Sequence, residues 1–281
     1  MALKDILVHL DGSKPAEGRL RLAANLARQH GAHLAVLHVV DIEVPLLASA
    51  DAGGGVAIAG VIEQMRNQAL TEAARLEAMA RERMRLEGLS GEWRQAEGLT
   101  AEQVALHARY ADLVVIGQDD PDGSTPNAAA VVEQVLFSSG RPALIVPYAG
   151  QYESVGQRVL VGWKPGREAA RAVNDALPLL AAAESVTVFS VNPRGGIGGH
   201  GEQPGADMAL HLARHGIKVR VEHSVAPGAA DADIILNQAA DMGADLLVVG
   251  AYGHSRIREM VMGGVTRTLL RQMTVPVLMS H

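Results

Sequence analysis

Ala244-Asp245-Leu246-Leu247-Val248-Val249-Gly250 differs at two positions from an earlier stretch of the same chain, Ala111-Asp112-Leu113-Val114-Val115-Ile116-Gly117. Each stretch is an apolar run that closes on a glycine. Such a short, continuously apolar run is typical of a strand buried on both faces in a parallel sheet. Two runs this alike, far apart in one chain, indicate an internal repeat.

The repeat extends over most of the sequence. Three further pairs of segments match in the same order and with similar spacing: 5–9 with 158–162, 33–39 with 185–191, and 141–146 with 275–280. Four matches in one order are hard to produce by chance. We therefore expect two tandem copies, residues 1–150 and 157–281, joined near Gly150 to Gln157.

Within each copy, strands alternate with helical patterns. In the first copy the expected elements are strands at about Asp5–Leu10, His33–Val40, Glu92–Glu97, Asp112–Ile116 and Ala143–Val146, with helices at about Val61–Leu86 and Ala101–Ala108. Apolar strands separated by helices predict an α/β fold. We expect two tandem doubly wound domains, each a mainly parallel five-stranded sheet flanked by helices. Sheet edges need covering, so the domains should pack as a pseudo-twofold dimer through Ala143–Val146 and Pro276–Met279.

Composition excludes several classes of function. The 281 residues carry a net charge of −6 and are 3% aromatic, which disfavours binding of nucleic acid. The chain has no cysteine, so disulfides and thiolate metal sites are excluded. No apolar run approaches the ~18–20 residues that span a bilayer. The start of the chain has no signal-peptide pattern, and we expect a cytoplasmic protein without membrane association.

Glycines follow the second apolar run and point to phosphate. Gly250 and Gly253 come directly after it, and Gly263 precedes a helical pattern that runs from Arg267 to Met273. Glycine lets the backbone approach a bound group closely, and the first N–H groups of a helix suit an anion. The pattern predicts nucleotide binding in the C-terminal half, the alternative being a tight strand-to-helix connection.

These residues resemble the universal stress protein family in its tandem, two-domain form, over nearly the whole chain. The family pattern is Gly-x2-Gly-x9-Gly-Ser/Thr, and Gly250, Gly253 and Gly263 match it. Gly264 stands in place of the last Ser or Thr, and Thr266 lies two residues on. The missing hydroxyl removes about 1 kcal/mol of phosphate binding. The resemblance implies ATP, or ADP or AMP, as the ligand, with or without Mg²⁺.

The two copies depart from the family in opposite ways. An Asp at the end of the first strand is present as Asp11 in the first copy, whereas Lys164 takes its place in the second. The first copy has an acidic segment after Gly117 and Ala129-Ala130 where glycines are expected. We expect a degenerate first site at Asp11, Val39 and Gly117. The resemblance gives a working second site at Trp163, Lys164, Val191, Gly250, Gly253, His254, Gly263, Gly264, Val265 and Thr266.

Several of these residues have a structural alternative. Asp11 could cap a helix or be a relic, and Trp163 could belong to the core. The acidic segment Asp119–Gly123 lacks the full calcium-loop spacing and predicts a solvated turn. The glycine-rich segments Ala48–Gly60 and Gly195–Gly201 are expected to be surface loops, with a lid as the alternative. The histidines are taken as scattered, without a His-x3-His or comparable ligand pair, so no metal site is expected.

The sequence carries no catalytic signature such as a Walker motif or a Gly-x-Ser-x-Gly elbow. The resemblance implies a regulatory stress protein that binds an adenine nucleotide with little or no turnover and acts on an unidentified protein partner. A nucleotide-free interaction scaffold is the alternative. A weak ATPase has no positive support. One chain should mimic a dimer, and pairing of two chains is left open.

Overall fold

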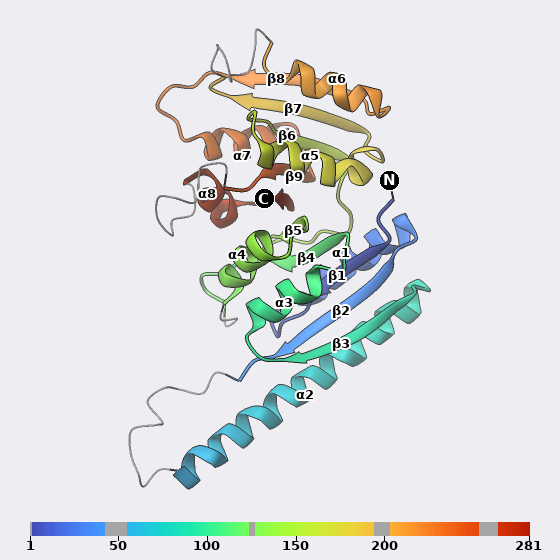
Figure 1. Ribbon diagram of the computed structural model, residues 1–281, viewed down its shortest axis with the longest axis vertical. Coiled ribbons are helices and arrows are strands. Elements are labelled where there is room, and N and C mark those ends of the chain that lie inside the picture. Colours follow the sequence, from blue (N-terminus) through green and yellow to red (C-terminus); the bar gives the residue numbers. More distant parts are fainter. Residues whose placement is uncertain (1, 43–54, 124–126, 194–202, 253–263) are drawn as a thin grey trace.

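The computed structural model describes residues 2–42, 55–123, 127–193, 203–252 and 264–281 (Figure 1). The elements of the first copy are β1 (Asp5–His9), α1 (Ala16–His30), β2 (His33–Val40), α2 (Gly55–Glu87), β3 (Gly91–Glu97), α3 (Thr100–Ala108), β4 (Leu113–Gly117), α4 (Ala128–Ser138) and β5 (Ala143–Val146). Those of the second copy are β6 (Arg158–Gly162), α5 (Arg167–Leu180), β7 (Ser185–Val191), α6 (Ala206–Arg214), β8 (Val219–Ser224), α7 (Asp231–Asp241), β9 (Leu246–Gly250), α8 (Gly264–Gln272) and β10 (Val277–Ser280).

The strands form one continuous sheet in the order β3-β2-β1-β4-β5-β10-β9-β6-β7-β8. All neighbours within a copy are parallel, and the two copies join through the antiparallel pair β5–β10, in which Leu144 lies opposite Leu278. The predicted fold class is confirmed, as is the meeting of the last strands. Where β5 meets β10, the carboxyl edges of the two half-sheets face in opposite directions.

Helices cover both faces of the sheet, and successive residues of each central strand alternate between the two cores. Ile6 and Val8 of β1 pack with α1 and α2, whereas Leu7 packs with α3 and α4. In the second copy α5 and α6 share the first core and α7 and α8 the second. Burial of aliphatic residues on both faces stabilises this three-layer arrangement, because each buried side chain contributes about 1.5–3 kcal/mol.

The longest helix, α2, begins earlier than its sequence pattern predicted. It starts at Gly55, so the expectation of a surface loop over the whole of Ala48–Gly60 was wrong for its last six residues. Residues 48–54 and the segment Gly195–Gly201 lie outside the described residues. Once a helix is nucleated, each added residue gains a hydrogen bond, so glycine within an apolar and alanine-rich sequence need not end it.

No helix in the described part of the chain combines the length and the apolar character that crossing a membrane requires.

Candidate functional site

The carboxyl edge of the second half-sheet brings together the ends of β6, β7 and β9. Lys164 follows β6 and is exposed, and Val191, the last residue of β7, is half-buried against the core. Trp163 extends the ladder, since its N–H donates to the carbonyl of Phe189 over 2.7 Å. The Trp163 side chain packs against the core formed with α5 and α6. The side chain of Trp163 therefore packs with the core, the alternative that its sequence position left open. Lys164 and Val191 lie at the sheet edge.

Gly250 is a site of close packing between a strand and a helix. A Cβ atom on Gly250 would lie 2.4 Å from the backbone nitrogen of Ala169 and 2.6 Å from the carbonyl carbon of Glu168, both near the start of α5. No side chain fits at that distance. The missing side chain of Gly250 thus lets α5 approach β9, a role that the sequence pattern did not distinguish from approach to a ligand.

The strand and the helix of the glycine motif are tied together at the ends of the loop. The backbone N–H of Tyr252 donates to Oγ1 of Thr266 over 3.3 Å, and the Thr266 side chain is buried. Gly264 is the first residue of α8, and Val265 beside it is exposed. Gly253, His254 and Gly263 lie outside the described residues. The hydroxyl of Thr266 therefore holds the chain just after β9 beside α8.

A buried carboxylate stands at the start of α5. Burial acts to raise the pKa of Glu168, but the hydrogen bond from Arg167, over 2.5 Å, and a backbone N–H bring the pKa below its ordinary value. Glu168 is therefore ionised at neutral pH. Because Glu168 packs beside Gly250, this carboxylate and the Lys164 side chain both belong to the second carboxyl edge.

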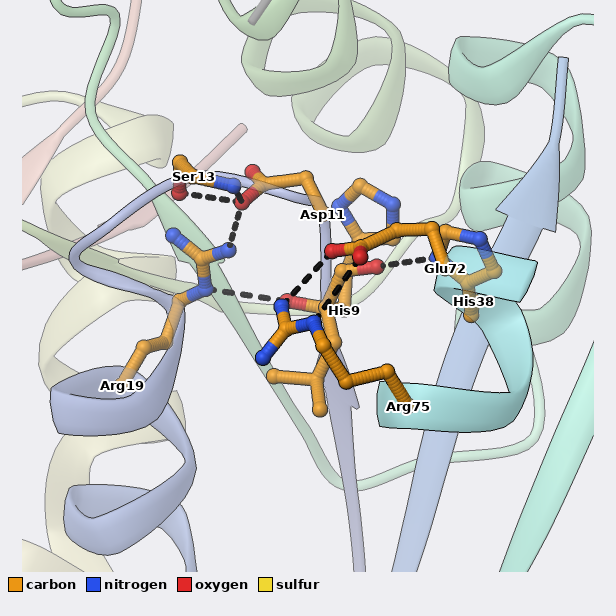
Figure 2. A network of polar contacts seen from close by, with 8 residues as sticks. His9, Asp11, Ser13, Arg19, His38, Glu72 and Arg75 are labelled. Carbon is orange, nitrogen blue, oxygen red and sulfur yellow. Dashed lines mark hydrogen bonds and ion pairs between the residues drawn. The ribbon is translucent and has the colours of Figure 1, made fainter. Parts of the chain in front are cut away.

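In the first copy, Asp11 is bound to an arginine that the sequence analysis missed (Figure 2). The Arg19 guanidinium reaches from α1 to Asp11 over 2.8 Å, and its Nε donates to the carbonyl of His9 over 2.9 Å. Burial favours a raised pKa for Asp11, but Arg19, His9 and Ser13 together lower that pKa to about 2. A Cβ on Gly117 would lie 2.2 Å from the guanidinium, so this glycine makes room for Arg19. Asp11 does not cap α1, whose N-cap forms no side-chain hydrogen bond; the Asp11 carboxylate is instead held by Arg19 and Ser13.

The segment after Gly117 connects the two copies. Nε2 of Gln118 donates to the carbonyls of Leu270 and Arg271 at the end of α8, over 2.8 and 3.2 Å. Its Oε1 accepts the N–H of Tyr148 over 3.2 Å. Gln118 therefore satisfies two carbonyls at the end of a helix in the other copy. The sequence indicated this role for Gln118 only weakly, because a single Gln beside an acidic run is typical of a polar surface loop.

The acidic residues that follow Gln118 form a local turn. The backbone N–H of Asp122 donates to the Asp120 carboxylate over 3.1 Å, and that of Gly123 to the Asp120 carbonyl over 3.0 Å. Over the ranges that the structure describes, no group of three or more His, Cys, Asp or Glu side chains is placed to hold a metal ion. These contacts are those of the solvated turn that the sequence predicted.

One histidine pair escaped the sequence analysis. His211 and His215 stand four positions apart in sequence, His211 within α6 and His215 directly after it, with ring centroids 4.8 Å apart. The expectation that the chain has no His-x3-His pair was therefore wrong, since side chains four positions apart on a helix face the same side. Two ligands make an incomplete metal site, because structural metal sites use about four.

Comparison with known proteins decides the family. A model of the universal stress protein family matches residues 2–147 and again residues 156–281. The chain belongs to the universal stress protein family. A universal stress protein from Synechocystis sp. is 25% identical over 297 residues, covering 98% of this chain and 99% of that protein.

Two solved structures share the tandem universal stress protein fold over almost the full length. The universal stress protein from Archaeoglobus fulgidus DSM 4304 aligns with a TM-score of 0.73 at 18% identity, covering 98% of this chain and 95% of its own. A functionally unknown protein from Pseudomonas aeruginosa PAO1 aligns with a TM-score of 0.58 at 17% identity, covering 99% of this chain and 92% of its own. At these identities the likeness concerns the fold.

Proposed function

We propose that this chain is a regulatory stress protein that binds ATP or a related adenine nucleotide in its second domain, residues 157–281, with little or no turnover. The hydrogen bond from Tyr252 to Thr266 carries the proposal, because it holds the end of β9 beside the start of α8. The loop between them has the family spacing at Gly250, Gly253 and Gly263. Ligands of doubly wound folds bind at this carboxyl edge, and the first N–H groups of a helix such as α8 suit an anion.

Charge favours the second domain over the first, although each carboxyl edge holds a carboxylate paired with an arginine: Glu168 with Arg167 in the second domain and Asp11 with Arg19 in the first. Lys164 is exposed at the second carboxyl edge, and its side chain forms no hydrogen bond or ion pair with the described residues.

In the first domain, Asp11 stands at the position that matches Lys164 and is bound to Arg19. The segment after β4 carries Asp120 and Asp122. Carboxylates repel phosphate, and they do so more strongly as water is excluded. The residues of the proposed site are Trp163, Lys164, Val191, Gly250, Gly253, His254, Gly263, Gly264, Val265 and Thr266.

Calorimetric titration with ATP and Mg²⁺ tests the assignment of the site. Lys164→Asp should weaken ATP binding roughly tenfold, which corresponds to about 1.4 kcal/mol. Lys218→Asp is the matched control, because Lys218 is an exposed lysine at the start of β8. Gly253→Asp should abolish binding. Equal ATP affinity in Gly253→Asp and the wild type would show that the nucleotide does not bind at this loop.

A nucleotide-free scaffold is the second candidate, and two departures from the family pattern favour it. Gly264 replaces a hydroxyl residue, and Lys164 replaces the strand-end carboxylate. In that case the wild type would show no heat of ATP binding and no thermal stabilisation. Release of inorganic phosphate from ATP, followed over many hours, measures turnover separately from binding.

A further inference from the structure

The sheet has an open edge at the end of the second domain. β8 is the last strand there, and in the described chain β7 is its one strand neighbour (Figure 1). Residues 220–223 are exposed, including Val221 at 40%. An uncovered edge strand presents unpaired backbone N–H and C=O groups. β8 therefore has the backbone groups that pairing with a strand of another chain requires.

The hydrogen bonds to β7 show which residues of β8 face the open side. The N–H of Val186 donates to the carbonyl of Lys218 over 3.1 Å, and that of Asn192 to the carbonyl of Ser224 over 2.8 Å. Alternate residues of a strand turn their backbone groups to the same neighbour, so the even-numbered residues from Lys218 to Ser224 face β7. The backbone groups of the odd-numbered residues point to the open edge; these residues are Val219, Val221 and His223.

The exposed charges of β8 lie on one face of the strand. Arg220 and Glu222 are two residues apart, so their side chains point to the same side of the sheet. Nε2 of Gln238, on α7, donates to Glu222 over 2.9 Å, which identifies this side as the one that α7 covers. Arg220 forms no hydrogen bond or ion pair with the described residues. Within the described chain, β8 thus presents a cation without a partner and a carboxylate that can accept further hydrogen bonds.

This order of charges is complementary to itself when two β8 strands run antiparallel. Outward-facing residues must lie opposite each other, which allows pairing centred on Arg220, on Val221 or on Glu222. Centring on Arg220 opposes two arginines, and centring on Glu222 opposes two carboxylates; like charges directly opposite destabilise a strand pair. Centring on Val221 places Arg220 opposite Glu222 of the second copy, at a position without backbone hydrogen bonds, where side chains approach most closely.

We propose that two copies of this chain associate through antiparallel pairing of their β8 strands, centred on Val221. Val221 then exchanges backbone hydrogen bonds with Val221 of the second copy, and Val219 does so with His223 of the second copy. The same arrangement forms an ion pair between Arg220 of each copy and Glu222 of the other. An edge strand also accepts a peptide of a different protein, but the self-complementary charge favours a second copy.

The molar mass in solution, measured by sedimentation equilibrium without nucleotide, tests the pairing. The wild type should form a species of twice 29.5 kDa. Arg220→Glu and Glu222→Arg should each raise the dissociation constant of the dimer roughly tenfold or more, because like charges then lie opposite each other. Arg109→Glu makes the same change of charge at an exposed residue of the first domain and should dimerise as the wild type does. Because no nucleotide is present, the result is independent of the proposed function.

Mixing the two charge variants distinguishes this interface from any other. In an equimolar mixture of Arg220→Glu and Glu222→Arg, one strand carries two carboxylates and the other carries two arginines, so unlike charges again lie opposite each other. The mixture should therefore recover the dimer, as a heterodimer of one copy of each variant. An interface elsewhere on the molecule predicts no such recovery.

Val221→Pro tests the backbone part of the pairing. Proline removes an N–H that points away from β7, so the β7–β8 ladder keeps its hydrogen bonds while the second copy loses a donor. The variant should be folded by circular dichroism and monomeric. A wild type that stays monomeric at every concentration tested would overturn the proposal and leave the edge to a strand of a different protein. A dimer that persists unchanged in Arg220→Glu and Glu222→Arg would also overturn it, because the interface would then lie elsewhere.

Discussion

The rings of Phe137 and Tyr252 pack against each other across the two domains, with centroids 4.3 Å apart and planes inclined by 35°. Phe137 belongs to α4 of the first domain, whereas Tyr252 lies inside the glycine motif of the second. Tyr252 has a positive φ of 59° and is buried. His281 approaches the Phe137 ring edge-on at 4.8 Å. The first domain therefore supports the backbone from which the proposed nucleotide loop departs.

Truncating Phe137 should weaken both the fold and nucleotide binding. Phe137→Ala should lower the free energy of unfolding by about 2–4 kcal/mol, since it removes a half-buried aromatic from a packed cluster. It should also weaken ATP binding, because Tyr252 loses its support. Urea unfolding and calorimetry measure the two effects. Tyr110→Ala, at a residue 77% exposed, should change neither. Unchanged ATP affinity in Phe137→Ala would show that the loop does not depend on the first domain.

Two tyrosine-to-phenylalanine variants should have opposite effects. The Tyr252 hydroxyl is buried without a hydrogen-bond partner in the described chain, and burial, together with Glu133, raises its pKa to about 12. Tyr252→Phe should leave stability unchanged or increase it by up to about 1 kcal/mol. Tyr152 donates towards the carbonyls of Ala149 and Thr274, over 2.8 and 2.9 Å. Tyr152→Phe should therefore cost about 1 kcal/mol. A larger loss for Tyr252→Phe in urea unfolding would mean that its hydroxyl has a partner.

The two glycines at the ends of the motif should respond differently to alanine. Gly250→Ala places a Cβ 2.4 Å from the Ala169 nitrogen and should destabilise the protein by more than about 2 kcal/mol. Gly264 has nothing within 4 Å of such a Cβ and begins α8, so Gly264→Ala should be neutral or stabilise by up to about 1 kcal/mol. Thermal unfolding distinguishes the two. Similar melting temperatures for both variants would contradict the close packing of α5 on β9.

Stability should fall as the pH is lowered from 6.5 to about 4 because of His9. The pKa of folded His9 is depressed from 6.5, so the unfolded chain takes up a proton at a higher pH than the folded chain. The contribution is fully present above pH 6.5 and on the order of 3 kcal/mol is lost by pH 4. The depressed pKa of Asp11 adds a further loss of stability as the pH falls from 3.8 to about 2.

Urea unfolding of the His9→Gln variant at pH 6.5 and at pH 4 isolates the contribution of His9 to the pH dependence of stability. The variant should lose markedly less stability between these two pH values than the wild type, because glutamine does not titrate. His223→Gln, at an exposed position, should behave as the wild type does. If His9→Gln and the wild type lose equal stability, the pH dependence lies in other groups.

Periodicity and repetition predicted the architecture well, because buried strands leave a continuous apolar signal. The strands His33–Val40 and Ala143–Val146 have the predicted bounds, and the β5–β10 junction follows from the need to cover sheet edges. Contacts between the domains were not predictable. Gln118 and Tyr252 each touch a residue more than 100 positions away, and nothing local marks such a partner.

At the candidate site, residue type showed which positions are special but not what they contact. Gly117 and Gly250 stand at matching strand ends, yet one accommodates the Arg19 side chain and the other the backbone of α5. Asp11 was visible as an acidic strand end, whereas its ion pair with Arg19 depends on how α1 packs. Gly253, His254 and Gly263 remain predictions from the family pattern.

The most direct test of the central claim is to denature freshly purified protein and to identify and count the released nucleotide by mass spectrometry. One adenine nucleotide per chain is expected in the wild type and none in Gly253→Asp, with Asp11→Ala unchanged. Two nucleotides per chain, or retention of one in Gly253→Asp, would contradict binding at the second domain's glycine loop.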